Sequence, residues 1–307
     1  MATSTNQDSK SDTLVDRLLD GDISVGVWFV LPTLLIMGVI LIYPLVRTVW
    51  LSFHVAQGSQ YVWVGLQNYI DVLESDWLGG VIFNTVLWTG LTVGLQFAVG
   101  IAAAMLLNTK FRGRAFVRGL WLVPWVTPGI VAALVWKWMY HPQFGVLNRF
   151  LTDIGLTDSY IAWLSNPDLA IFAIILAGVW KGFPFSMIMY LAGLQSINQD
   201  LYRAAHIDGA PWYARFWHVT LPQLRPVLKV TILLTTIWTF NYFVLVFAMT
   251  GGGPAGSTDI LPNKVYTLAF NEFQFGLSSA LAIIMFLILM VFMVFYVRAL
   301  KQQGEEL

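Results

Sequence analysis

The chain has 307 residues, of which 57% are hydrophobic, 15% aromatic and only 11% charged, and its mean hydropathy is +0.69. Soluble domains carry roughly 25% charged residues, so this composition predicts a protein embedded in a lipid bilayer. The formal net charge is zero, which gives no sign of a nucleic-acid partner. Because the chain has no Cys, it has no disulfide framework, thiolate nucleophile or Cys-based metal site.

The first two dozen residues are polar and rich in Asp, and they lack the basic start of a cleaved signal peptide. We therefore expect residues 1–24 to form a cytoplasmic tail and the first apolar helix to be retained. Within this tail, Ser11 or Asp12 is placed to cap a short helix with one apolar side, which would lie on the membrane surface and end at Gly21. A disordered leader is the alternative.

Six apolar runs are long enough to cross a bilayer core of about 30 Å, which takes roughly 20 residues of helix. They lie near 25–46, 81–107, 117–140, 169–193, 227–249 and 279–299. With the N-terminus inside, twelve of the 17 Lys and Arg residues fall in inner segments and four in outer ones. The positive-inside rule then predicts that both termini face the cytoplasm. We expect an all-α integral membrane protein with six transmembrane helices over residues 25–302, followed by a tail over 303–307.

The charges also argue against several classes of function. All 17 Asp and Glu residues fall outside the six runs, whereas ion-coupled transporters usually keep a carboxylate near the membrane midplane. Lys181 is the only charge well inside a run. No Gly-Lys dipeptide occurs, so no phosphate-binding GxxxxGK[ST] loop is present. The four His residues lack metal-ligand spacing, and we expect no metal site and no catalytic centre.

The segment between the fourth and fifth runs is polar and contains glycine and proline. Asn198 suits the N-cap position of a short helix that Gly209 would stop. Pro211 suits the first turn of a second helix, which Asp208 would cap and which would end before Pro222. The segment is either a rigid surface for a partner protein or an ordinary interfacial loop with an aromatic belt.

The same segment resembles a family signature: Ala204-Ala205, three residues, Gly209, nine residues, and then Val219-Thr220-Leu221-Pro222. The family is that of the permease subunits of binding-protein-dependent ABC importers of the carbohydrate type. Further stretches resemble this family in the same order along the chain. They are 65–69, 84–85, 113–128, 136–148, 180–185, 192–197, 251–258 and 276–280.

The resemblance implies a type I ABC importer transmembrane domain, in which the segment 198–222 couples to ATPase subunits. The residues implied in ATPase coupling are Arg203, Ala204, Ala205, Asp208, Gly209, Leu221 and Pro222. The family often has Glu where this chain has Arg203, so the local charge is inverted. Either the ATPase carries a compensating acid, or Arg203 faces solvent.

The expected substrate path lies where helices are broken near the membrane midplane. Pro124 and Pro128 would interrupt the third run, and Gly182 and Pro184 the fourth. In the fifth run, aromatic and hydroxyl side chains recur at helical spacing, which suits sugars; packing is the alternative for each of them. The candidate residues are Trp125, Gly129, Lys181, Gly182, Phe185, Thr235, Trp238, Thr239, Asn241 and Tyr242, and the resemblance implies sugar contact for all of these except Trp238 and Asn241.

The resemblance further implies a set of partners in a prokaryotic plasma membrane. They are a second permease subunit, two ATP-binding subunits that hold ATP-Mg, and an extracytoplasmic solute-binding protein. This chain itself would bind no cofactor and would hydrolyse no ATP. A passive channel or an ion-coupled carrier for small polar solutes is the alternative function, and a membrane-embedded enzyme or scaffold is a third class without a supporting constellation of residues.

Overall fold

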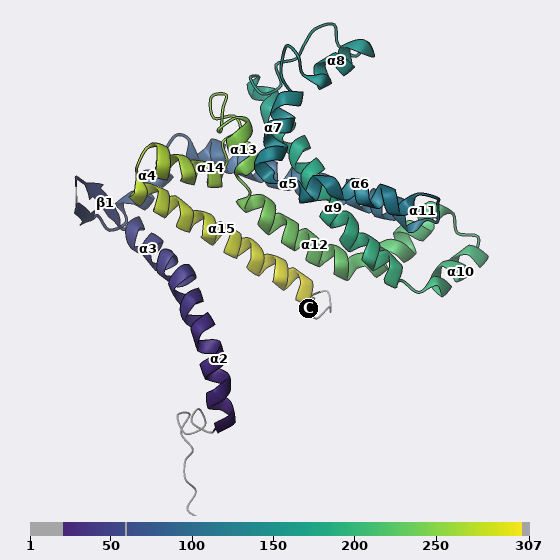
Figure 1. The fold of residues 1–307 in the computed structure, drawn as a ribbon, viewed down its shortest axis with the longest axis horizontal. Coiled ribbons are helices and arrows are strands. Elements are labelled where there is room, and N and C mark those ends of the chain that lie inside the picture. The colour runs from purple at the N-terminus through teal and green to yellow at the C-terminus, as the bar shows by residue number, and fades with distance from the viewer. Residues whose placement is uncertain (1–20, 59, 303–307) are drawn as a thin grey trace, which may run out of the picture. The chain divides into compact units, whose positions relative to one another are not determined.

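The structure is a computed structural model that describes residues 21–58 and 60–302 (Figure 1). The chain divides into two compact units, residues 1–51 and 52–307, and each is described by itself. The surface helix expected after Ser11 or Asp12 and the C-terminal tail lie outside the described residues.

The described part of the first unit is helical throughout. It consists of α2 (Gly21–Met37), a single π-helical turn (Gly38–Ile42) and α3 (Tyr43–Ser52). The stretch Trp28–Ser52 is long and apolar enough to cross a membrane, and none of its most apolar window is buried. A helix that is apolar on all sides suits a lipid environment, as the first predicted span requires.

The second unit begins with a short β-hairpin that the all-α expectation missed. Strands β1 (His54–Gln57) and β2 (Gln60–Trp63) pair antiparallel. The buried Asn68 of α4 (Gln67–Leu73) fastens the hairpin by donating to the carbonyl oxygens of Ser52, at 2.9 Å, and His54, at 3.0 Å.

Two long helices, α5 (Leu78–Asn108) and α9 (Pro167–Ser196), share the most extensive helix–helix contact of the second unit. Glycines allow this close approach. A Cβ placed on Gly100 would come within 2.8 Å of the Ser186 Cβ, and one placed on Gly178 within 2.6 Å of the Trp88 ring. Small residues let membrane helices pack closely in the absence of a hydrophobic force between them.

The predicted spans are confirmed in part. Among the described residues, four helical stretches meet the length and hydropathy of a membrane span, at Trp28–Ser52, Leu78–Asn108, Pro167–Ser196 and Phe275–Ala299. The third predicted span is a pair of helices, α6 (Arg114–Val126) and α7 (Gly129–Met139), bent by 98°.

The fifth predicted span has a different form from the one expected. It consists of α12 (Leu221–Asn241), which begins six residues before the predicted start at 227, and the short α13 (Val244–Met249). Arg225, Lys229 and several threonines lower its hydropathy, so it is absent from the stretches that are apolar enough to span.

The two predicted helix breaks differ in outcome. Pro124 lies inside α6 and does not interrupt it, so that part of the prediction is wrong. The break at Pro128 is confirmed: Thr127 and Pro128 both leave the helical region, with ψ angles of 128° and 139°, because a proline disfavours the helical conformation of the residue before it. The break at Gly182 and Pro184 is wrong, since α9 runs on for 30 residues. A proline inside a membrane helix is tolerated when neighbouring groups supply hydrogen-bond partners for the backbone carbonyl that the proline leaves free.

The remaining elements complete the second unit. They are α8 (Val146–Asp153), α10 (Gln199–Ile207), α11 (Trp212–Arg215), a π-helical turn (Phe216–Thr220), α14 (Leu261–Tyr266), a further π-helical turn (Thr267–Asn271) and α15 (Phe275–Gln302). Within the part of the chain that the structure describes, the buried side chains form three apolar clusters, of which one surrounds Trp88 and Ile174 at the contact of α5 with α9.

Candidate functional site

A cavity of about 170 Å³ lies among α5, α6, α9 and α12. Most of the residues that the sequence assigned to the substrate path line it. They are Trp125, Lys181, Gly182, Phe185, Thr235, Trp238, Thr239 and Tyr242. The structure therefore brings together side chains from three helices and from the residue that follows α12.

Aromatic rings form one wall of this cavity. The Phe185 ring centroid lies 4.8 Å from that of Trp238 and 6.0 Å from that of Trp125. The side chains of Trp125 and Trp238 are about half exposed, so their faces are accessible. This arrangement offers apolar surfaces on which a flat C–H face of a solute can pack.

Polar groups line the rest of the cavity, and two of them lack a partner. The Thr92 Oγ1 and the Tyr242 hydroxyl are buried and make no hydrogen bond within the described part of the chain. In contrast, Thr235 donates to the carbonyl oxygen of Thr231 at 2.8 Å, so its proton is already used by the preceding helical turn. Buried polar groups normally have partners, and the two unsatisfied hydroxyls are suited to bind a polar ligand or water.

Lys181 links α9 to the break between α6 and α7. Its Nζ donates to the carbonyl oxygen of Thr127 at 2.8 Å and to that of Trp125 at 3.4 Å. Both carbonyls lie at the end of α6, where the helix stops and no longer supplies N–H partners. Lys181 is the only charged side chain among the lining residues.

Two residues of the expected path do not line the cavity. Gly129 begins α7 behind Tyr242, since a Cβ on Gly129 would collide with the Tyr242 hydroxyl. Asn241 is exposed, and its Nδ2 donates back to the carbonyl oxygen of Ile237 at 2.8 Å.

Four lining residues escaped the sequence analysis: Trp88, Thr92, Gln96 and Gly178. Trp88 Nε1 donates to the Thr239 carbonyl oxygen at 3.0 Å, and Gln96 Nε2 to that of Gly178 at 3.1 Å. The signal was present, because Trp88, Thr92 and Gln96 recur every four residues within an apolar run and so share one helix face.

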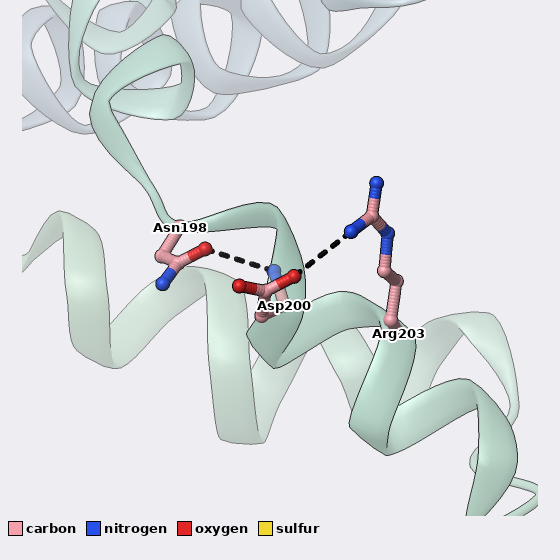
Figure 2. A network of polar contacts seen from close by, with 3 residues as sticks. All are labelled: Asn198, Asp200 and Arg203. Carbon is pink, nitrogen blue, oxygen red and sulfur yellow. Dashed lines mark hydrogen bonds and ion pairs between the residues drawn. The ribbon is translucent and has the colours of Figure 1, made fainter.

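The segment 198–222 folds largely as expected at its start. Asn198 caps α10 by accepting a hydrogen bond from the Asp200 amide at 2.9 Å, and Arg203 pairs with the Asp200 carboxylate at 2.9 Å (Figure 2). Both charged side chains are largely exposed, by 76% and 72%. Gly209 follows α10 with a φ of +76°, the left-handed conformation typical of a helix end.

The second half of the segment differs from the prediction. Asp208 follows α10 as its C-cap, and Pro211 is the N-cap of α11, which is only four residues long. The helical path then continues through a π-helical turn into α12, so Leu221 and Pro222 lie in the first turn of α12. The expected end before Pro222 is wrong, because a proline fits a first helical turn as well as it fits a stop. Ala204 and Ala205 lie on α10, and Ala204 is exposed.

Comparisons with known proteins agree with this architecture. Residues 96–303 match the family described as the binding-protein-dependent transport system inner membrane component. The trehalose/maltose transport system permease protein MalF of Thermococcus litoralis is 37% identical over 292 residues, which cover 94% of this chain and 97% of that protein. The sulfoquinovosyl glycerol transport system permease protein SmoG of Agrobacterium fabrum is 34% identical over 289 residues, 93% of each chain.

A solved structure shows the same fold. One chain of a bacterial ABC transporter involved in the import of the acidic polysaccharide alginate superposes with a TM-score of 0.82 and 22% identity, covering 95% of this chain and 99% of that one. A passive channel or ion-coupled carrier, which the residues alone left open, is not favoured. With this fold and this extent of sequence match, the chain belongs to the family of binding-protein-dependent transport system inner membrane components.

Proposed function

We propose that this chain is one of two different permease subunits of an ATP-driven importer in a prokaryotic plasma membrane, and that the solute is a sugar or a sugar-like molecule. The observation that carries the solute class is the cavity with an aromatic wall and two unpartnered hydroxyls. The names of the relatives from Thermococcus litoralis and Agrobacterium fabrum, a trehalose/maltose and a sulfoquinovosyl glycerol permease, support it.

In this proposal the cavity is part of the translocation path. A sugar presents apolar C–H faces, which would pack on Trp125, Phe185 and Trp238, and hydroxyl edges, which would bond Thr92 and Tyr242. The Lys181 ammonium has three donors; two are used on backbone carbonyls, and the third would reach the solute.

The segment 198–222 would be the surface on which an ATPase subunit acts. Its α10 has an exposed Ala204, and Gly209 follows the C-cap of that helix, so a partner can approach the backbone closely. The helical path from α11 into α12 is unbroken, and α12 carries Thr235, Trp238 and Thr239 of the cavity. A push on the segment would therefore move one wall of the cavity, as in a rigid-body switch between inward and outward access.

The membrane topology follows from the same proposal. The chain would cross the membrane six times, with the bent pair α6–α7 as the third span and α12 with α13 as the fifth. The excess of Lys and Arg in the inner segments supports a cytoplasmic location for both termini and for the segment 198–222. An extracytoplasmic binding protein would deliver the solute, and ATP-Mg would bind only to the two ATPase subunits.

The test is to express this chain with the genes that adjoin it, purify the assembly and measure its ATPase activity with and without a solute-loaded binding protein. We expect stimulation by the loaded protein, uptake into vesicles, and a large loss of uptake in Trp238→Ala. Trp138→Ala is the matched control, since Trp138 is an exposed tryptophan of α7 outside the cavity. Solute uptake by this chain alone, or equal uptake in the two variants, would overturn the proposal.

A further inference from the structure

A second cavity, of about 340 Å³, lies where the segment 198–222 meets the end of α5. Its polar lining consists of Asn108, Gln199, Tyr202, Arg215 and Thr220. It shares no lining residue with the cavity among α5, α6, α9 and α12. Its volume is within the range of about 300–1,000 Å³ that is usual for small-molecule sites.

Arg215 is the charged group of this second cavity. Its Nε is buried and makes no hydrogen bond within residues 21–58 and 60–302. Asp200, which follows the lining residue Gln199 on α10, is paired with Arg203. A guanidinium is permanently charged and donates through a planar fork that matches carboxylate and phosphate oxygens. A buried donor of this kind indicates an anionic ligand, because leaving such a group unpaired is costly.

The other lining groups favour an oxyanion rather than a cation. The Tyr202 hydroxyl lies 2.9 Å from that of Thr220, which itself donates to the carbonyl oxygen of Arg215 at 3.4 Å. The neutral donors that remain for a ligand are the side-chain amides of Asn108 and Gln199. No Asp or Glu lines the cavity. The site thus combines one cation with neutral donors, which is the chemistry that binds a phosphate group.

The surroundings indicate where the phosphate comes from. Trp212, Tyr213 and Trp217 flank Arg215 on α11 and the π-helical turn, and they are 70%, 57% and 61% exposed. Exposed Trp and Tyr gather at the level of lipid headgroups. A lipid source for the phosphate rests on the proposed cytoplasmic location of the segment 198–222, because basic residues near the inner membrane surface attract anionic lipids.

We propose that the second cavity binds the phosphate group of an anionic membrane phospholipid, with Arg215 as its charged donor. The inference does not depend on which solute is transported. It assigns a lipid site to the segment 198–222, beside the surface to which an ATPase would bind.

The experiment is native mass spectrometry of the full-length chain titrated with phosphatidylglycerol or phosphatidylcholine. Both lipids carry a phosphodiester that Arg215 can bond, but the choline ammonium of phosphatidylcholine would repel the guanidinium. We therefore expect phosphatidylglycerol to bind at least about tenfold more tightly. Arg215→Gln should remove the preference. Arg203→Gln, which removes an exposed cation of the same segment, should keep it. Arg215→Lys should restore part of it, which separates loss of charge from loss of folding.

Competition with inorganic phosphate, with chloride at matched ionic strength as the control, tests whether the site binds a lipid phosphate or free phosphate. Displacement of phosphatidylglycerol by inorganic phosphate in the wild type, but no such effect in Arg215→Gln, supports the phosphate site. If inorganic phosphate binds through Arg215 and the lipid does not, the lipid assignment is wrong. Equal lipid preference in wild type and Arg215→Gln, or binding at Arg215 of an acidic side chain of an ATPase subunit instead, would overturn the proposal.

Discussion

Lys181 of α9 donates a 2.8 Å hydrogen bond to the carbonyl oxygen of Thr127, the residue at which α6 stops. In an unbroken helix this carbonyl would accept from an N–H four residues on, and the turn at Pro128 removes that partner. The lysine and the helix break therefore form one unit: the break frees an acceptor, and the ammonium satisfies it inside a largely apolar cavity. The Lys181 ammonium therefore has a hydrogen-bond partner within the protein, whether or not a solute is bound.

Replacing Lys181 by Met should loosen the bend between α6 and α7. The lost charge-assisted hydrogen bond corresponds to about 1.5–3 kcal/mol, and we expect a lower thermal midpoint together with reduced uptake. Lys137→Met is the control, because Lys137 is exposed and makes only a 3.5 Å contact with the Ala248 carbonyl oxygen. Unchanged stability and uptake in Lys181→Met would contradict both the structural role and the solute contact.

Adding one methyl group at Gly182 should narrow the cavity. A Cβ there would collide with the Gln96 amide, so Gln96 must move and lose its bond to the Gly178 carbonyl oxygen. We expect Gly182→Ala to reduce uptake well before it reduces folding. Gly119→Ala, on α6 with open space around it, should leave uptake near the wild-type level. If uptake falls equally in both variants, the loss comes from replacing glycine by alanine within a helix and not from narrowing of the cavity.

The helix ends could be predicted from neighbouring residues in the sequence. The features that the sequence did not predict depend on packing between helices. Asn198, Gly209 and Pro128 act within a turn of the chain, so their effect on the backbone can be read from neighbouring residues. The continuity of α9 through Pro184 depends on neighbouring helices. The orientation of Trp88, Thr92 and Gln96 toward the cavity also depends on packing, because it is set by the contact of α5 with α9. The hairpin was missed because its strands have only four residues each.

Gly209 should matter for coupling to an ATPase as well as for stability. Its φ of +76° is unfavourable by roughly 1–2 kcal/mol for a residue with a Cβ. We expect Gly209→Ala to weaken the stimulation of ATPase activity by a loaded binding protein. Gly155→Ala is matched in backbone strain, with a φ of +72° and open space around it, but it follows α8. If both variants keep full stimulation, the turn at Gly209 is not part of the coupling surface.

Arg203→Glu should change little. The pair of Arg203 with Asp200 is largely exposed, and exposed ion pairs contribute about 0–1 kcal/mol. We expect stimulated ATPase activity to stay within about twofold of wild type, which is less than 1 kcal/mol. A strong loss that an acid-to-base change on the ATPase restores would instead reveal a specific pair across the interface.

Asp259, in the loop before α14, should give the protein a pH-dependent stability. Burial raises the pKa of its carboxyl above the ordinary value of 3.8, although bonds from Asn263 and the charge of Lys264 oppose this. The folded state therefore binds the proton more readily, and the free energy of unfolding falls as the pH rises from 3.8 through the raised pKa.

Asp259→Asn tests this dependence, because the amide oxygen keeps the acceptor for Asn263 Nδ2, which lies 2.6 Å from the carboxylate. In a series of thermal unfolding curves, the variant should lose the slope over this pH window. If stability changes with pH equally in the wild type and the variant, a group other than Asp259 causes the pH dependence.

The most direct test of the account is whether α10 touches an ATPase subunit. Because the natural chain has no Cys, a single Ala204→Cys variant can be labelled with a maleimide, with Leu156→Cys, at an exposed position after α8, as the control. The account predicts that binding of the ATPase subunit protects position 204 and leaves position 156 reactive. Equal labelling of position 204 with and without the ATPase would contradict it.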